Sequence, residues 1–294
     1  MKRLSELDTL RGLAALSVII GHIYLIYPFV PNYVNFSPFH IFWAASEAVI
    51  LFFILSGFVL SIPFMNANYK LNYYGYILKR VCRIYIPYLI AVSLSFLLFN
   101  MFPNSGNEGL SEWFNDKWNI HSNSGSFIQH LLLLGNFQTT YINPVVWSLI
   151  HELRISLLFP IIMIAILRFN WKINLFLAVI LSLCSMINRG LNFELAMGFK
   201  NSYIDSFHYL AMFIIGSLIC KNVKQLTTIY NKLKTRNKEF LNIIGVLFYI
   251  YSQGIHYIFP QNYVYVISDW GVALGGSIFI LSAISLSQSN KNNF

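Results

Sequence analysis

The sequence predicts an all-α protein that crosses a membrane several times and forms a single domain over residues 1–294. Hydrophobic residues make up 56% of the chain and charged residues only 11%, whereas a soluble domain carries about 25% charged residues. Apolar runs of about 20 residues, the length of one helical crossing, recur along the chain. No Pro-, Gly- or Ser-rich spacer divides it. Together these observations predict a polytopic transmembrane helical bundle.

Eight segments are predicted to be spans, and the connections between them justify each boundary. In chain order the connections are the turn after residue 28, a basic stretch (70–83), a long, mainly acidic stretch (108–117), a basic pair (168–172), a mixed stretch (189–205), a strongly basic stretch (221–238) and a short break near residue 260. The predicted spans are 9–28, 41–63, 84–102, 145–168, 173–189, 206–220, 240–259 and 264–286.

The distribution of basic residues predicts the orientation. With the N-terminus in the cytoplasm, the inner connections hold most of the Lys and Arg residues, as the positive-inside rule expects. The outer connections hold only Lys117, Arg189 and Lys200. The net charge of +9 therefore reflects topology, and nucleic-acid binding is not predicted.

Residues 127–137 are apolar but too short to cross a bilayer. We expect a re-entrant or interfacial segment on the outer side. No metal site is predicted either: the three cysteines have no metal-ligand spacing, and the HE pair at His151 lacks the second histidine of a zinc-protease motif.

The first span carries three ionisable residues, Asp8, Arg11 and His22. Ionisable side chains inside a membrane are expensive and are functional candidates by default. On a helix, Arg11 and His22 share one face about 16 Å apart, and Asp8 lies one turn before Arg11. An imidazole changes protonation near neutral pH, which suits a general base.

Four polar residues are predicted to share one layer below the outer surface. His22, Glu47, Glu152 and Asp269 each lie about 8–12 Å from the outer end of their spans. This common depth predicts one buried polar chamber that opens outward. Each has a structural alternative, since a lone histidine is more often a packing residue and a glutamate near a span end can reach the interface. His208 and His256 are predicted to be interfacial.

Arg80 and Arg83 are one helical turn apart at the predicted cytoplasmic side. Paired guanidinium groups bind phosphate oxygens well. The alternative is that they only mark the positive inner side. With Arg11 on the same side, a phosphate-bearing ligand that enters from the cytoplasm is a plausible partner.

Four blocks resemble the signatures of the acyltransferase-3 family of membrane acyltransferases. RGLAALSVIIGH (11–22) is similar to its Arg-x10-His signature, LFFILSGFVL (51–60) to FFxxSGF, and RVCRIYIPY (80–88) to RxxR-aromatic-x-Pro. VWSLIHELRISLLFP (146–160) is similar to its WSLxxE block. The blocks occur in the family's order and cover about the first 160 residues.

The resemblance implies a bacterial inner-membrane enzyme that transfers an acyl group, most often acetyl, from cytoplasmic acyl-CoA to a carbohydrate. The acceptor would be a cell-envelope or exported polysaccharide, such as O-antigen or capsule, free or lipid-linked. Acetyl-CoA would be a co-substrate, with no permanently bound cofactor. The family's last one or two spans have no counterpart here, so a C-terminally truncated chain is expected.

The resemblance assigns roles to the matching residues. His22 and Glu152 would be catalytic, with Glu152 orienting the His22 ring and with either direct transfer or an acetyl-His22 intermediate. Arg11, Arg80 and Arg83 would bind acyl-CoA. Supporting or acceptor-binding positions are Asp8, Glu47, Ser56, Trp147, Ser148 and Arg154.

Two other functions remain open at this point. A transporter or channel would use His22, Glu47 and Glu152 as an ion or proton pathway. A scaffold in a polysaccharide-assembly complex would need no catalysis. Oligomeric state is not predicted, because small residues pack helices within chains as readily as between them.

Overall fold

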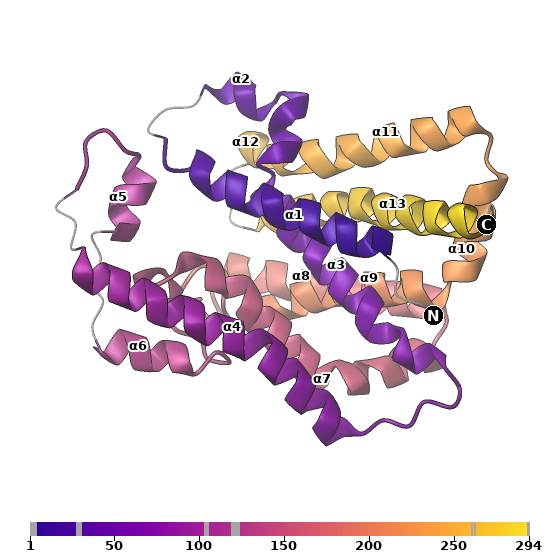
Figure 1. Cartoon of the computed structure of the whole chain (residues 1–294), viewed down its shortest axis with the longest axis horizontal. Helices are drawn as coiled ribbons and strands as arrows, with labels where there is room; N and C mark the ends of the chain where they lie inside the picture. The colour runs from indigo at the N-terminus through magenta and orange to yellow at the C-terminus, as the bar shows by residue number, and fades with distance from the viewer. Residues whose placement is uncertain are drawn as a thin grey trace.

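The structure is a computed structural model that describes residues 5–27, 31–102, 106–118, 124–259, 261 and 263–292. Within these ranges all regular secondary structure is helical (Figure 1). The elements are α1 (Ser5–Tyr24), α2 (Asn32–Asn35), η1 (Pro38–Phe42), α3 (Ala45–Ser61), η2 (Pro63–Met65), α4 (Tyr73–Met101), α5 (Glu112–Trp118), α6 (Ser124–Leu131), η3 (Thr139–Tyr141), η4 (Pro144–Val146), α7 (Trp147–Arg168), α8 (Trp171–Leu191), α9 (Asp205–Lys221), α10 (Val223–Lys232), α11 (Thr235–Tyr251), η5 (Ser252–Gly254), α12 (Ile255–Ile258) and α13 (Val264–Asn292).

The predicted all-α membrane bundle is confirmed. Six helical segments are long and apolar enough to cross a membrane: those of α1, α3, α4, α7, α8 and α13. A seventh span results only if α9 is combined with α10, which is bent from it by 71°. The predicted span 240–259, which corresponds to α11, is not among them: the helix has 17 residues and begins with the polar stretch TRNKE. The 3-10 turn η5 then ends its apolar part.

The third span begins earlier than predicted. The Asn72 side chain caps α4 by accepting a hydrogen bond from the Gly75 amide at 3.0 Å. The helix therefore starts at Tyr73 and includes both Arg80 and Arg83. Their predicted one-turn spacing on a helix is thus realised inside α4.

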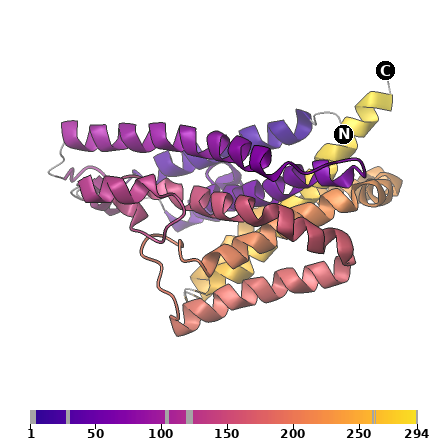
Figure 2. The same ribbon diagram turned by 90° about the horizontal axis from the view of Figure 1, so that it is seen from below.

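Successive long helices run in alternate directions (Figures 1 and 2). The starts of α1 and α4 and the ends of α3 and α7 lie at one end of the bundle, which we call the Ser5 end. The end of α1 and the starts of α3, α7, α9 and α13 lie at the other, which we call the Tyr24 end. Figure 2 shows α4 and α8 on opposite faces of the molecule, with α7 and α9 between them.

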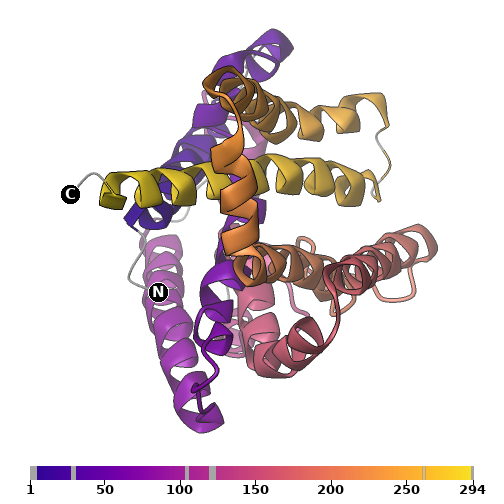
Figure 3. The ribbon, with the colours of Figure 1, turned by 90° about the vertical axis from the view of Figure 1, so that its right-hand side faces the viewer.

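The core is built around α3, which packs against α1, α9 and α13 and lies inside the bundle in the end view (Figure 3). Ile54, Leu55 and Phe58 are completely buried. Glycines let α3 and α9 approach closely: a methyl group added at Gly57 would overlap the Phe213 carbonyl oxygen, and one at Gly216 would overlap that of Ile54. Small residues at such crossings are typical of membrane helices.

We expect Gly216→Ala to destabilise the protein more than a Gly→Ala change at a position with free space around it. The added methyl group meets rigid backbone, so its cost should reach or exceed the upper end of the usual range for overpacking, about 1–3 kcal/mol. Thermal unfolding of the solubilised protein measures this, with Gly12→Ala as the matched control because nothing lies within 4 Å of a methyl group there. Equal melting temperatures for the two variants would contradict the close α3–α9 contact.

The outer helices expose apolar side chains. On α1 these include Leu13, Leu16 and Ile23, and on α4 Ile86 and Ile90. A contiguous apolar face of this extent is unfavourable in water and suits the hydrocarbon of a bilayer.

Candidate active site

The first candidate site is a cavity of about 620 Å³ between α1, α3, α4 and α7. We call it the Arg chamber because three arginines line it. Its polar lining includes Arg11, Ser56, Arg80, Arg83, Asn143, Ser148 and Glu152. The structure thus brings together most of the residues that the four sequence blocks predict for the site.

An ion pair between α4 and α7 crosses the Arg chamber. The Arg80 Nη2 atom donates to Glu152 Oε1 at 2.5 Å, and Arg80 Nε donates to Ser156 Oγ at 2.9 Å. From α3, Ser56 Oγ donates to the same Glu152 oxygen at 3.3 Å. The Arg80 side chain is 9% exposed, so Glu152 and Ser156 hold its guanidinium group in a fixed position.

The other two arginines are not neutralised. Neither Arg11 nor Arg83 forms an ion pair with a described residue, although Arg11 donates to the Leu55 carbonyl at 3.3 Å. Glu152 is the one carboxylate among the lining residues. The chamber therefore has an excess of positive charge, which attracts an anionic ligand.

The second candidate site is a cavity of about 500 Å³ near the Tyr24 end of α1. We call it the His22 chamber. Besides His22 its polar lining includes Ser95, Trp113, Lys117 and Asn143. The Trp113 ring of α5 packs edge-on against the His22 ring, with 6.3 Å between their centroids.

The hydrogen bond of the His22 ring fixes its tautomer. Nδ1 lies 2.7 Å from the Val18 carbonyl oxygen. Because a carbonyl oxygen can only accept, Nδ1 must carry the proton. In the neutral ring Nε2 then has the lone pair, and it has no hydrogen-bond partner among the described residues. Nε2, the ring nitrogen that can accept a proton, is thus the one that does not bind the backbone of α1.

The predicted contact between Glu152 and His22 is wrong. Glu152 pairs with Arg80 in the Arg chamber, and the Val18 carbonyl orients the His22 ring instead. Similar depth in the membrane did not bring the two side chains together, because they line different chambers.

The two chambers adjoin. Val18, Ile19, Asn143 and Val145 line both of them. We call the two neighbouring chambers, with the arginines in one and His22 in the other, the α1–α4 groove. Arg11 and His22 lie on the groove side of α1, as predicted. Sequence reasoning missed Asn143 at the junction: its Oδ1 caps the turn before α7, while its Nδ2 has only a long 3.5 Å contact with Ser95 Oγ. In the sequence, the position of Asn143 directly before Pro144 indicates only a turn.

The predicted single polar chamber is wrong: His22 and Glu152 line two different chambers, and the other two members lie outside both. Glu47 pairs with His40 at 3.0 Å and lines a third cavity of about 390 Å³, which we call the Glu47 cavity. Asp269 accepts hydrogen bonds from His208 at 3.1 Å and from Gln253 at 2.8 Å. His208 is fully buried, not interfacial.

Besides Glu47, three of the predicted supporting residues do not line the groove. The three guanidinium nitrogens of Arg154 are occupied by the carbonyls of Leu134, Gly135, Asn201 and Ser202 and by Ser206 Oγ. Arg154 therefore ties the segment after α6 to the loop before α9. Trp147 packs on Phe199 and Tyr209. Asp8 lies one turn before Arg11 in α1 and does not line either chamber.

The segment predicted to be re-entrant or interfacial contains a short helix. Of residues 127–137, the first five belong to α6, which ends at Leu131 and is too short to cross a membrane. Arg154 and Asn201 then bind the carbonyls of the following turn, including that of Phe137 at 2.6 Å.

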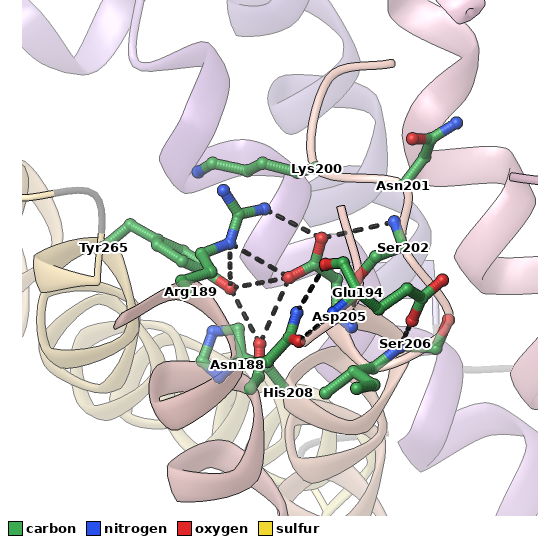
Figure 4. Close-up of polar contacts among 12 residues, drawn as sticks. Asn188, Arg189, Glu194, Lys200, Asn201, Ser202, Asp205, Ser206, His208 and Tyr265 are labelled. Atoms are coloured by element: carbon green, nitrogen blue, oxygen red, sulfur yellow. Dashed lines mark hydrogen bonds and ion pairs between the residues drawn. The ribbon is translucent and has the colours of Figure 1, made fainter. Parts of the chain in front are cut away.

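A further polar cluster lies at the Tyr24 end, and its pairing was not predicted (Figure 4). Arg189 forms a two-point ion pair with Asp205, at 3.0 Å and 2.8 Å, and also donates to the Tyr265 hydroxyl at 3.0 Å. Asp205 is 1% exposed. The sequence assigns both charges only to a connection between spans, and their positions at its two ends are the available signal.

Among the described residues no group of three or more His, Cys, Asp or Glu side chains is arranged to hold a metal ion.

Comparison with known families gives one match. Residues 4–293 match the model of a family described as an acyltransferase domain. The match extends the likeness from the first 160 residues through the later helices. No curated protein and no solved structure matches the chain.

Proposed function

Because the chain belongs to the acyltransferase-3 family and is therefore a membrane acyltransferase, we propose that it transfers an acetyl group from acetyl-CoA to a hydroxyl group of a cell-envelope or exported polysaccharide. The α1–α4 groove is the observation that carries this proposal. One end of the groove carries unneutralised arginines, and the other carries a histidine oriented as a base.

The donor would bind at the Ser5 end. Arg11 and Arg83 would bind the phosphates of acetyl-CoA, while Glu152 holds Arg80 in position to join them. The basic connections of the chain, from residue 221 to 238 for example, support a cytoplasmic Ser5 end. In a bacterial inner membrane this end faces the acetyl-CoA pool, and the Tyr24 end faces the exported acceptor.

The pantetheine arm would extend along the groove past Val18 and Ile19, which line both chambers. This path would bring the thioester near Asn143 and His22. The length of α1 between Arg11 and His22, about 16 Å, suits an extended arm better than a compact ligand. The groove can therefore hold the phosphates at the arginines and the thioester near His22 at the same time, which a single small chamber could not do.

The proposed chemistry uses groups that line the His22 chamber. Nε2 of His22 removes the proton from the acceptor hydroxyl as that oxygen attacks the thioester carbonyl. Asn143 Nδ2 donates to the developing oxyanion, a role that its loosely held amide can take. When the intermediate collapses, the C–S bond breaks, the acetyl group stays on the acceptor oxygen, and the CoA sulfur takes the proton from the imidazolium.

The proposal is tested first by donor binding to the full chain in neutral-lipid nanodiscs, with radiolabelled acetyl-CoA as the probe. We expect Arg83→Gln to weaken binding about 10- to 100-fold, because a hydrogen bond to a charged group contributes about 1.5–3 kcal/mol. Lys172→Gln is the matched control: it removes one positive charge at the same end, outside the chamber.

Acceptor use is measured in a host that lacks the native gene, by NMR of O-acetyl groups on its surface polysaccharide. Binding and O-acetylation by the wild type support the proposal. If the wild type does not bind acetyl-CoA, or if Arg83→Gln and Lys172→Gln bind it equally well, the groove is not the donor site. Acetyl-CoA-independent proton flux would favour the transporter alternative.

A further inference from the structure

A fourth cavity, of about 420 Å³, lies at the Tyr24 end and takes no part in the proposed acetyl transfer. We call it the Lys200 pocket. It lies between the end of α8, the loop before α9 and the start of α13 (Figure 4). Its lining includes two cations, Arg189 and Lys200, and two carboxylates, Glu194 and Asp205, together with Asn192, Phe199, Gln261 and Tyr265. Both carboxylates already have donors: Asp205 pairs with Arg189, and Glu194 accepts from the Tyr203 and Ile204 amides.

The pocket is separated from the α1–α4 groove by the first turns of α7. Ser148 and Glu152 of α7 line the Arg chamber. On another face of the same helix, His151 Nε2 forms a hydrogen bond of 2.7 Å with the Lys200 carbonyl oxygen, and Trp147 packs on Phe199. The Lys200 pocket is therefore a second site, supported by the same helix that lines the first.

Lys200 presents an ammonium group without an acceptor. Its backbone is in the left-handed region, with φ of 48°, and its Nζ lies 4.3 Å from the centre of the Tyr265 ring and 5.3 Å from that of Phe199. Nζ makes no hydrogen bond or ion pair with a described residue. Burial lowers the pKa of this ammonium; the charges of Asp269 and Asp205 act against that effect, and the charge of Arg189 adds to it.

Arg189 has donors to spare beside it. Its Nε and Nη2 atoms bind Asp205 and Tyr265, whereas Nη1 has no partner among the described residues. Figure 4 shows the Lys200 amine and the guanidinium of Arg189 on the same side of the cluster. Two neighbouring cations repel each other, and an anion between them would remove that repulsion. The unused donors of both residues are suited to carboxylate or phosphate oxygens.

The remaining lining is suited to a sugar. Phe199, which is half exposed, offers an aromatic surface to the pocket, whereas the buried Tyr265 ring is covered by Lys200 and Arg189. The exposed Asn192 and Gln261 offer amides that have no hydrogen-bond partner among the described side chains. Apolar and aromatic surface with a few polar groups is typical of small-molecule sites. The lining thus combines surface for a sugar ring with cations for an acidic substituent.

From this arrangement we infer that the Lys200 pocket binds an anionic substituent, carboxylate or phosphate, of the acceptor glycan, with Lys200 and Arg189 as the cations. The inference rests on the proposed function for the identity of the ligand as acceptor. His256 lines both this pocket and the Glu47 cavity, whose lining includes Gly21 and Tyr24 of α1. A glycan held at Lys200 thus lies at the same end of the bundle as His22.

The test is equilibrium binding to the full chain in phosphatidylcholine nanodiscs. The probes are trigalacturonate and its neutral methyl ester, with galactose 1-phosphate and galactose as the phosphate pair. We expect one or both anionic probes to bind wild type about tenfold more tightly than the neutral partner, and the pair that differs identifies carboxylate or phosphate. Lys200→Met should remove the difference and Lys200→Arg should keep most of it.

Lys224→Met is the matched control, since Lys224 is an exposed lysine that lines none of the four cavities. Equal binding of charged and neutral probes to wild type would overturn the inference, and so would a preference that survives Lys200→Met or is lost equally in Lys224→Met. The wild-type comparison decides even if a variant does not fold. Acetyl-CoA binding in the same nanodiscs separates the two proposals: a Lys200-dependent preference without acetyl-CoA binding would retain the pocket and reject acetyl transfer.

Discussion

Replacing His22 with alanine is expected to lower the rate of acetyl transfer by about 10²–10⁴-fold, the usual contribution of a positioned general base. Donor binding should change little, because the arginines that would bind the phosphates lie in the other chamber. The measurement pairs the transfer rate with acetyl-CoA affinity in the same nanodiscs. Loss of transfer with unchanged affinity is the expected result.

Two variants control this experiment. His22→Gln keeps much of the side-chain volume but provides no base, so it should be as inactive as His22→Ala. Glu152→Gln tests the corrected geometry: since Glu152 contacts Arg80 and not His22, the pH at which activity falls on the acid side should stay where it is in the wild type. Full activity of His22→Gln would exclude Nε2 as the base.

Removing either member of the Arg80–Glu152 pair is expected to lower both stability and donor affinity. Loss of one partner leaves the other charge partly buried and unpaired, which costs about 3–5 kcal/mol in buried pairs. Because the Glu152 side chain is 24% exposed, we expect Arg80→Met to lower the free energy of unfolding by an amount at the lower end of that range. Thermal unfolding and acetyl-CoA binding measure the two effects.

The double variant Arg80→Met/Glu152→Met separates the two effects. It removes both charges, so most of the stability should return, whereas donor affinity should stay low because the phosphate-binding cation is absent. Arg83→Met is the companion control, since Arg83 is exposed and has no partner among the described residues; it should weaken binding without lowering the melting temperature. Recovery of donor binding in the double variant would contradict a direct role for Arg80.

The structure gives a physical reason for one of the sequence blocks. In the SGF triplet, Ser56 donates a hydrogen bond to Glu152 at the Arg chamber. Gly57 allows α9 to approach α3, and Phe58 is fully buried in the core. The triplet therefore links the packing of the central helix to the position of the Arg80–Glu152 pair.

The amino-acid pattern alone predicts the class of the protein, the approximate position of each long helix, and the face that Arg11 and His22 share on α1. These properties depend on local composition and on helical periodicity, which are encoded along the chain. The one-turn spacing of Arg80 and Arg83 is likewise a local property of the sequence. The predicted span 240–259 does not correspond to one full-length span, because a polar start and a 3-10 turn shorten the apolar part of α11.

Which polar groups meet depends instead on how the helices pack against one another. Glu152, Glu47 and His22 were predicted at similar depths, yet each lines a different cavity, because depth along a helix does not specify the direction in which its side chain points toward neighbours. The contact of α3 with α9 through Gly57 and Gly216, and the placement of α4 across α7, set those directions. The same packing joined Arg189 to Asp205 and left the Lys200 ammonium without an acceptor, neither of which can be read from residue spacing.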